Sequence, residues 1–560
     1  MFVRPFVFGV VSGLVLAATV AAQASVPLDV GTVEGIHDLG PAPASVKVRV
    51  AVVLRYRHEA ELDRLVEAQA DPGSKVYHHF LAPSNFRDYF APTPAQYERV
   101  SAALQSGGFT ISHAFANRTV VDATAPAPVA ARFFSTDIHR VIAPDVRGVT
   151  YTNVRAGTVP SSLDGLVLTV VGLDAATRLQ PAYIRATPLS PRPLRANVQR
   201  NANPVFGPDG GYGPPVFVNS YDMPAANGIT GTGRASGVAT DNDFLDSDLA
   251  AYLAYFNVQR TGPATTRVLV DGGPPPGLGN DSVETTLDVE TIVSISPGTA
   301  LYVYEAPYDE PTNSNFIDIY NSVVNDNKVD TLNSSYIYCE TRMRHLFHGY
   351  PHAVDAVEKQ GAALGITFHA ATGDSGSSSP GCSRRVSVGV SSSTPHNIAV
   401  GGTTLGVNSN GFETSEVGWG GTGGGVSKIF RLPTYQNGVQ NTIETGRNLP
   451  DLAFDADPGS GESFYYSGFW SGPIGGTSLA SPIFGAALTQ LDQLQNSRAG
   501  YFNVTLYKTW LANGYGSGSK TYFRDITQGS IPPFYAQAGY DQMSGIGAMQ
   551  VSNFATLLHH

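Results

Sequence analysis

A serine stands at the start of an expected apolar helix in the C-terminal part of the chain. Ser478 lies in the run G-G-T-S-L-A-S-P at 475–482, and apolar residues continue to Leu491. Free backbone N–H groups and the positive end of the helix dipole surround a serine in this position. They can stabilise the negative oxygen that forms when an acyl group is attacked. The same pattern also suits a serine that only caps a helix, so the motif alone leaves both readings open.

A serine hydroxyl is a poor nucleophile without a base, and the usual base is histidine. The chain has 13 histidines, but none lies in an H-G-T-H-like setting at a helix start. His345, His348 and His352 stand close together, but Pro351 interrupts any helix that they could share. This favours a loop and a helix start over a three-histidine metal site.

Carboxylates offer another route to a base. The run V-E-T-T-L-D-V-E-T at 283–291 places Glu284, Asp288 and Thr291 on one face of a helix. Two carboxylates one turn apart can share a proton, which separates their titrations and lets one act as a base while the other holds it. In acid, such a carboxylate stays partly ionised when an imidazole is already protonated. The alternative is a solvated acidic helix face.

A further carboxylate follows an apolar run. Asp374 lies in A-T-G-D-S-G at 371–376, directly after the strand-like residues 366–371. Open α/β sheets build their sites at the carboxyl ends of strands. The alternative is an aspartate that only makes a turn.

Together these motifs resemble those of the sedolisin (serine-carboxyl) peptidases. The resemblance rests on G-D-S-G around Asp374, G-G-T-S-x-A-S-P around Ser478, and E-x-x-x-D from Glu284 to Asp288. Similar segments are W-G-G-T-G-G-G-V-S (419–427), P-T-Y-Q (433–436), V-G-G-T-T-L (400–405), P-D-L-A (450–453) and, far upstream, Y-H-H-F-L-A-P (77–83), which looks like the family's activation-domain signature.

The resemblance implies a role for each catalytic residue. Ser478 would be the nucleophile, Glu284 the general base, and Asp288 the group that orients Glu284. Asp374 would lie in the oxyanion hole, where only the protonated acid can donate a hydrogen bond. Acid activity would therefore rest on two carboxyl groups with different duties.

The family also carries one structural calcium ion near the C-terminus. F-R-D-I-T (523–527) and A-G-Y-D (538–541) resemble the two halves of that site. The implied ligands are the carboxylates of Asp525 and Asp541 and the carbonyls of Ile526, Gln537 and Gly539, an all-oxygen set that suits calcium. Gln537 stands where the family usually has glycine, which would strain the backbone if a positive φ were required. The alternative is a turn without metal.

The expected substrate-binding residues are Ser335, Tyr336, Ile337, Gly423 and Gly424. Ile337 replaces a family glycine that borders the pocket for the residue before the cut, and V-S-S-S at 390–393 replaces a Pro-Ala-Ser stretch. Both departures put the substrate preference in doubt, not the reaction. The two cysteines, Cys339 and Cys382, flank Asp374 in sequence, so a disulfide between them would brace the oxyanion segment.

These side chains need an α/β framework. Strand-like runs at 266–270, 300–305, 365–371 and 397–400 alternate with helix-like runs at 246–256, 315–325 and 352–364. This alternation favours a parallel sheet with helices on both faces, and the family resemblance implies a subtilisin-like fold. Upstream, a strand at 46–56, helices at 59–70 and 93–107 and four short β-rich runs predict a small α+β prodomain, ferredoxin-like by the resemblance.

Four parts are therefore expected along the 560 residues. They are a signal peptide (1–24), an inhibitory activation domain (25–185), a Pro-, Gly- and Arg-rich linker with the maturation cut (186–216) and a peptidase domain (217–560). Arg4, the apolar run 6–20 and A-Q-A at 22–24 are typical of a cleaved signal, although a membrane anchor is the alternative. A cleaved signal predicts secretion, with no membrane attachment afterwards.

The composition limits the partners. The net charge is −11 and no long basic run occurs, which argues against nucleic acid. Only 14% of the residues are charged, so the surface is largely neutral and suits an acidic medium. We expect a monomeric, self-processing acid endopeptidase that acts on proteins or peptides and is inhibited by its own prodomain. The rival interpretations are a catalytically silent binding protein on the same fold and a histidine-dependent subtilisin-like protease.

Overall fold

The computed structural model describes residues 27–28, 35–144, 146–185, 204–279, 282–308, 314–346 and 349–558. The expected signal peptide and residues 186–203 of the expected linker lie outside these ranges, as do the side chains of His345 and His348.

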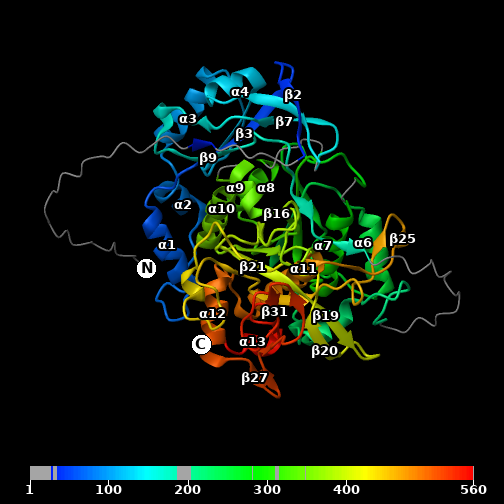
Figure 1. Ribbon diagram of the computed structural model, residues 1–560. Coiled ribbons are helices and arrows are strands. Elements are labelled where there is room, and N and C mark those ends of the chain that lie inside the picture. The colour runs from blue at the N-terminus through cyan, green and yellow to red at the C-terminus, as the bar shows by residue number, and fades with distance from the viewer. Residues whose placement is uncertain are drawn as a thin grey trace, which may run out of the picture.

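The N-terminal part is a small antiparallel α+β domain (Figure 1). Its main sheet has the strand order β4-β5-β3-β9, which is the order of a ferredoxin-like fold, and β2, β6 and β7 form a second sheet. The strands are β2 (His37–Pro41), β3 (Lys47–Leu54), β4 (Thr110–Ala114), β5 (Val120–Pro126), β6 (Ile138–Ile142), β7 (Val149–Asn153) and β9 (Val167–Val171); the helices are α1 (Glu59–Ala70), α2 (Pro83–Tyr89), α3 (Pro94–Ser106) and α4 (Ala127–Phe133).

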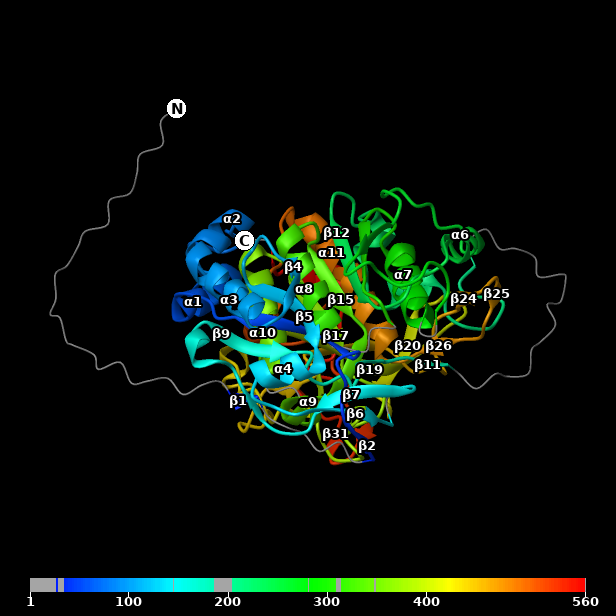
Figure 2. The same ribbon diagram turned by 90° about the horizontal axis from the view of Figure 1, so that it is seen from above.

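Strand β3 explains how this domain meets the rest of the chain. Val48, Val50 and Val52 pack in the domain's own core, whereas Ala51 and Val53 belong to the large core that continues into the C-terminal part. Successive side chains of a strand point to opposite faces, so one sheet serves two cores. The sheet thereby lies over α8 (Ser314–Asp326) and α10 (Tyr350–Leu364) (Figure 2).

The C-terminal part is built on a mostly parallel sheet, which confirms the predicted fold class. Its strand order is β13-β14-β12-β15-β17-β19-β20, with β23 also paired to β19. All neighbours are parallel except β19 and β20. The strands are β12 (Ala235–Thr240), β13 (Thr266–Leu269), β14 (Ala300–Glu305), β15 (Thr331–Ser334), β17 (Thr367–Ala371), β19 (Asn397–Val407), β20 (Glu413–Gly418) and β23 (Leu452–Asp455).

Helices cover both faces of this sheet. Helices α8 and α10 pack together on the face toward the N-terminal domain, while α7 (Ser282–Ile295) and α11 (Thr477–Gln495) pack together on the other (Figure 2). The remaining helices are α5 (Pro214–Ser220), α6 (Asp246–Tyr255), α9 (Glu340–Leu346), α12 (Phe502–Asn513) and α13 (Val551–Ala555).

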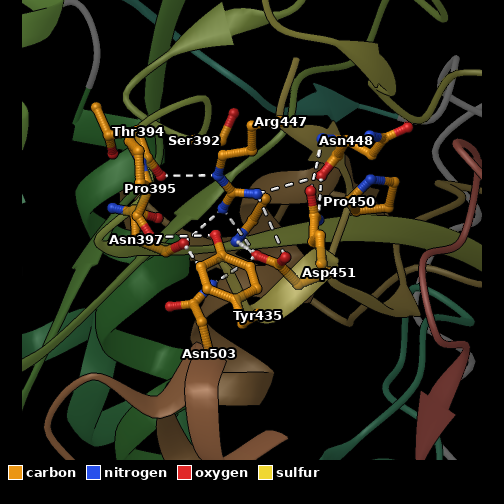
Figure 3. Close-up of polar contacts among 12 residues, drawn as sticks. Ser392, Thr394, Pro395, Asn397, Tyr435, Arg447, Asn448, Pro450, Asp451 and Asn503 are labelled. Atoms are coloured by element: carbon orange, nitrogen blue, oxygen red, sulfur yellow. Dashed lines mark hydrogen bonds and ion pairs between the residues drawn. The ribbon is translucent and has the colours of Figure 1, made fainter. Parts of the chain in front are cut away.

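A buried ion pair lies at the amino ends of β19 and β23 (Figure 3). Arg447 and Asp451 are both fully buried, and Arg447 Nη2 lies 2.9 Å from Asp451 Oδ2. The guanidinium also donates to the carbonyls of Thr394 (2.8 Å) and Asn397 (2.6 Å), and Asp451 accepts from the backbone N–H of Ala399 (2.8 Å). A buried pair is favourable only when its other donors and acceptors are satisfied, and here the backbone satisfies them.

The two cysteines form a disulfide, as expected. It joins Cys339, at the end of β16 (Tyr336–Cys339), to Cys382 in the loop after Asp374. Among the described residues, no helix is long and apolar enough to cross a membrane.

Candidate active site

Ser478 is the second residue of α11 and is fully buried. The residue before the helix, Gly476, has a φ of 108°, and a Cβ there would lie 2.5 Å from both Asp374 Oδ2 and the carbonyl oxygen of Ala182. Only glycine combines this backbone conformation with such a close approach. The G-G-T-S motif therefore brings the helix N-terminus against two other chain segments.

The carboxylates of α7 lie inside the molecule. Every residue of α7 is buried, which excludes the alternative of a solvated acidic face. Ser478 Oγ donates to Glu284 Oε2 over 2.9 Å, and Asp288, one turn further on, accepts from Ser335 Oγ over 2.8 Å. Burial raises the pKa of Asp288 well above its usual range, although Ser335 and Asn333 act in the opposite direction. A base beside the serine and a protonated partner are therefore compatible with this helix face.

Asp374 follows β17 and meets the N-terminus of α11. Its Oδ1 accepts from the backbone N–H of Thr477 (2.7 Å) and from Thr477 Oγ1 (2.9 Å). Its Oδ2 is buried without a hydrogen-bond partner among the described residues. Burial raises the pKa of Asp374 to about 7, although both bonds from Thr477 lower it. At acid pH this group carries a proton, so Oδ2 can donate.

A segment from the N-terminal part runs through the site. Residues 180–181 (β10) pair antiparallel with β16, and residues 184–185 (β11) pair antiparallel with β26 (Ile474–Gly475), which lies beside β11 in Figure 2. Between these strands, Ala182 N–H donates to the Ser335 carbonyl and the Ala182 carbonyl accepts from the Ser478 N–H, both over 2.9 Å. The chain therefore passes Ser478 as an extended peptide, with a carbonyl oxygen on a helix-terminal N–H.

The predicted substrate-binding residues divide into two groups. Ser335, Tyr336 and Ile337 form the strand edge that pairs with 180–182. Among the described residues, no backbone hydrogen bond joins Gly423 or Gly424 to this segment; instead the Gly423 N–H donates to the Gly373 carbonyl over 2.6 Å. A Cβ at Gly423 would lie 1.9 Å from the Thr372 carbonyl oxygen, so this glycine supports the loop that holds Asp374.

Some side chains around the site were not expected from the sequence. Asn333 Nδ2 donates to Ser335 Oγ over 3.1 Å, and Ser481 Oγ donates to Asn333 Oδ1 over 2.6 Å. His369 Nδ1 lies 3.0 Å from Ser481 Oγ, and burial lowers the pKa of His369 to about 3. These residues form a row that ends on Asp288. Ser481, the second serine of T-S-L-A-S-P, could have been predicted to lie near the site, because it stands one helical turn after Ser478.

Histidine does not take part in the serine's hydrogen bonds. Among the described side chains, none of the hydrogen bonds of Ser478 involves a histidine, and His369 contacts Ser481 instead. His352 lies in α10, where its ring packs against Phe430. This arrangement disfavours the histidine-dependent alternative.

The predicted calcium ligands come together at the C-terminal loops. Asp525 Oδ2 accepts from the Gly539 N–H (3.0 Å), which links the two halves, and Asp541 Oδ2 accepts from the Gln537 N–H (2.9 Å) within its own half. Gly539 has a φ of 85°, but Gln537 is not among the residues with positive φ. The expected backbone strain at Gln537 is therefore wrong, because this position does not need a glycine conformation. Two carboxylates with nearby backbone carbonyls fit the oxygen chemistry of calcium.

Another acidic cluster does not need a metal. Asp122, Asp271 and Asp318 lie close enough together to hold an ion. However, the Arg49 guanidinium contacts Asp271 and lies 2.8 Å from Asp318. The chain itself supplies the positive charge at this boundary between the two domains.

Comparison with known proteins agrees with the geometry. The chain is 30% identical to sedolisin of Pseudomonas sp. (strain 101) over 542 residues, which cover 92% of this chain and 88% of that protein. The chain belongs to the sedolisin family. It is also 27% identical to kumamolisin of Bacillus sp. (strain MN-32), over 91% of both chains. Residues 34–176 match the family model of the pro-kumamolisin activation domain.

The solved structures agree with the sedolisin family as well. The structure of Pseudomonas sedolisin, a serine-carboxyl proteinase in complex with pseudo-iodotyrostatin, covers 62% of this chain and 97% of its own. The TM-score is 0.55 at 26% sequence identity. This chain is therefore a sedolisin-type serine-carboxyl peptidase, made as a zymogen with an N-terminal activation domain.

Proposed function

We propose that this sedolisin-type enzyme is a secreted, acid-acting endopeptidase in which Ser478 attacks the peptide bond. The observation that carries the proposal is the extended segment 180–185, which passes Ser478 with the Ala182 carbonyl on the Ser478 N–H. Because the segment pairs with the enzyme on both sides of Ser478, the cleft accepts a chain that continues in both directions. This supports endopeptidase action.

The chemistry follows from the contacts. Glu284 takes the proton from Ser478 Oγ as the oxygen attacks the carbonyl carbon. Asp288 lies one helical turn after Glu284, and the family resemblance assigns it the role of orienting Glu284. The oxyanion forms between the Ser478 N–H and the protonated carboxyl of Asp374. Glu284 then returns the proton to the amine as the peptide bond breaks and the amine departs. The acyl group remains bound to Ser478 Oγ as an ester, which water then hydrolyses.

The activation domain is the first substrate of this site. The peptide bond between Ala182 and Tyr183 has its carbonyl in the position of the reacting one. We propose that this bond is cut first, before any cut in the linker 186–216. For as long as the segment fills the cleft, the enzyme is inactive toward other chains.

Two further parts of the proposal concern the setting. The apolar N-terminal run supports export by a cleaved signal peptide. Asp525 and Asp541, with the carbonyls of Ile526, Gln537 and Gly539, would hold one calcium ion, which would tie together the two C-terminal loops.

The test uses the purified zymogen at pH 4, followed by N-terminal sequencing of the products. We expect the wild type to release a chain that begins at Tyr183, and Ser478→Ala and Glu284→Gln to release none. As a control, Asn496→Gly changes an exposed residue at the C-cap of α11, where glycine keeps the left-handed backbone conformation, and it should process normally. Cleavage by the Ser478→Ala protein would contradict the proposed nucleophile.

A further inference from the structure

The pocket for the side chain before the cut bond is already filled by the enzyme itself. Ile337 is fully buried, and it forms an apolar cluster with Ala182 and Ala371. The Ala182 side chain belongs to the residue whose carbonyl meets Ser478. Ile337 therefore lies where a larger side chain at position 182 would have to go.

The surroundings of Ile337 leave it little room to move. A Cβ on Gly389 would lie 2.2 Å from Ile337 Cγ1 and 2.4 Å from Cδ1, and a Cβ on Gly373 would lie 3.4 Å from Cδ1. The isoleucine therefore fills the space that glycine leaves open on the neighbouring segments. Isoleucine is also restricted at χ1 because it is branched at Cβ.

The strand that carries Ile337 is held in place. Its end is tied to the loop after Asp374 by the Cys339–Cys382 disulfide, and β16 pairs with β18 (Gly389–Val390). Tyr336 and Ile337 also pair with Pro181 and Gln180. A bulky substrate side chain would therefore have to displace a packed wall, and overpacking of such a site is unfavourable.

We infer that Ile337 restricts the residue on the amino side of the cleaved bond to alanine, glycine or serine, and that Ala182 provides such a residue in the chain's own activation segment. This inference rests on the proposed function, because it names the substrate class of the same site.

The first experiment measures kcat/KM of the mature enzyme on peptides Leu-Gln-Pro-X-Tyr-Ile-Arg, which copy residues 179–185 with X in place of Ala182. We expect cleavage after X when X is alanine, glycine or serine, and values about 100-fold lower when X is leucine or phenylalanine. Equal rates for alanine and phenylalanine would overturn the inference, whatever any variant does.

The second experiment opens the pocket. Ile337→Gly should raise kcat/KM for the phenylalanine peptide at least about 10-fold and lower its preference for alanine. A variant that cleaves the alanine peptide but keeps the wild-type ratio would contradict the role of Ile337. If Ile337→Gly does not fold, the graded series Ile337→Val and Ile337→Ala replaces it, with a smaller shift in the same direction.

The zymogen provides an independent check. Ala182→Phe should slow self-processing at this bond about 100-fold, whereas the matched control Ala182→Ser should process like the wild type. Combining Ala182→Phe with Ile337→Gly should restore the cut. If no peptide is cleaved, or if Ser478→Ala cleaves the alanine peptide, the proposed function fails. If peptides are cleaved without discrimination at X, only the pocket inference fails.

Discussion

Asp374 offers the sharpest test of the acid mechanism. Its free oxygen, Oδ2, has no partner among the described residues, and burial raises the pKa of this group to about 7 with a peptide segment in the cleft. The pKa values of the occupied enzyme appear in the pH profile of kcat. The protonated fraction falls to about one tenth one pH unit above the pKa, so kcat should fall about tenfold between pH 6 and pH 8.

The substitution Asp374→Asn separates charge from shape. The amide keeps an acceptor for the bonds from Thr477 and places an N–H₂ group, which donates at every pH, where Oδ2 lies. We expect Asp374→Asn to remain active at pH 5 and to lose the fall in kcat near pH 7. Asp374→Ala, which removes the donor, should lose about 10²–10³ in kcat at all pH values.

The assay is the initial rate of cleavage of the alanine peptide at saturating concentration, from pH 3 to pH 9. An Asp374→Asn enzyme whose kcat still falls near pH 7 would show that another group causes the loss of kcat at high pH. An Asp374→Asn enzyme as inactive as Asp374→Ala would show that this position does not donate to the oxyanion. Either result would refute the reasoning.

Three further predictions concern stability. Chelation of calcium should lower the Tm of the Ser478→Ala zymogen, and Asp541→Asn should remove this sensitivity to chelator; an unchanged Tm in both would contradict the calcium site. Replacing Cys339 and Cys382 together by serine should lower the free energy of unfolding by about 4 kcal/mol, because the disulfide closes a loop of 43 residues; urea titration measures the loss, and an equal stability would contradict the bracing role. The Ser478→Ala zymogen with its disulfide intact should be more stable toward urea at pH 5 than at pH 7.5. Burial raises the pKa of Asp174 and Asp374 to about 7 and that of Glu462 to about 8. Between about pH 4.5 and pH 8 the folded state therefore binds protons that the unfolded state has lost. The free energy of unfolding falls over this range by up to about 1.4 kcal/mol per pH unit for each such proton. A urea midpoint that rises with pH would contradict this.

Much of the framework was predictable because hydrophobic periodicity is local. The helix at Glu59–Ala70 was predicted at its observed bounds, and the capping box of Thr93 and Gln96 begins the next long helix as Thr93-Pro94 indicated. The run V-K-V-R-V-A-V-V-L shows why the pattern of β3 changes from alternating to continuous: its second face is also buried, against the C-terminal part. The sequence could not show that second core, since it depends on a distant partner.

The candidate site was predictable where its chemistry lies in short motifs. Ser478, Glu284 and Asp374 were each candidates from local patterns, and the three motifs together carried the family resemblance. The structure places Ser478 Oγ beside Glu284 and Asp374 beside Thr477, the residue before Ser478. What could not be read was the passage of residues 180–185 through the cleft, because short extended segments leave no periodic signal. The prediction that Gly423 and Gly424 bind substrate remains untested, since Gly423 contacts the Gly373 carbonyl instead.

The two halves of the segment that crosses the cleft are anchored differently, which has a consequence for the time course of activation. After the cut, residues 180–182 remain part of the activation domain, whose sheet is packed onto the enzyme. Residues 183–185 remain part of the chain that continues through the linker into the peptidase domain. After the first cut, the new carboxyl terminus at Ala182 would stay in place, so the cut molecule would still be silent. We expect a lag in which the fraction of chains that are cleaved exceeds the fraction of the final activity that has appeared. The cut itself would be independent of concentration, but the end of the lag would come sooner at high enzyme concentration, because each freed enzyme can digest the activation domains of others.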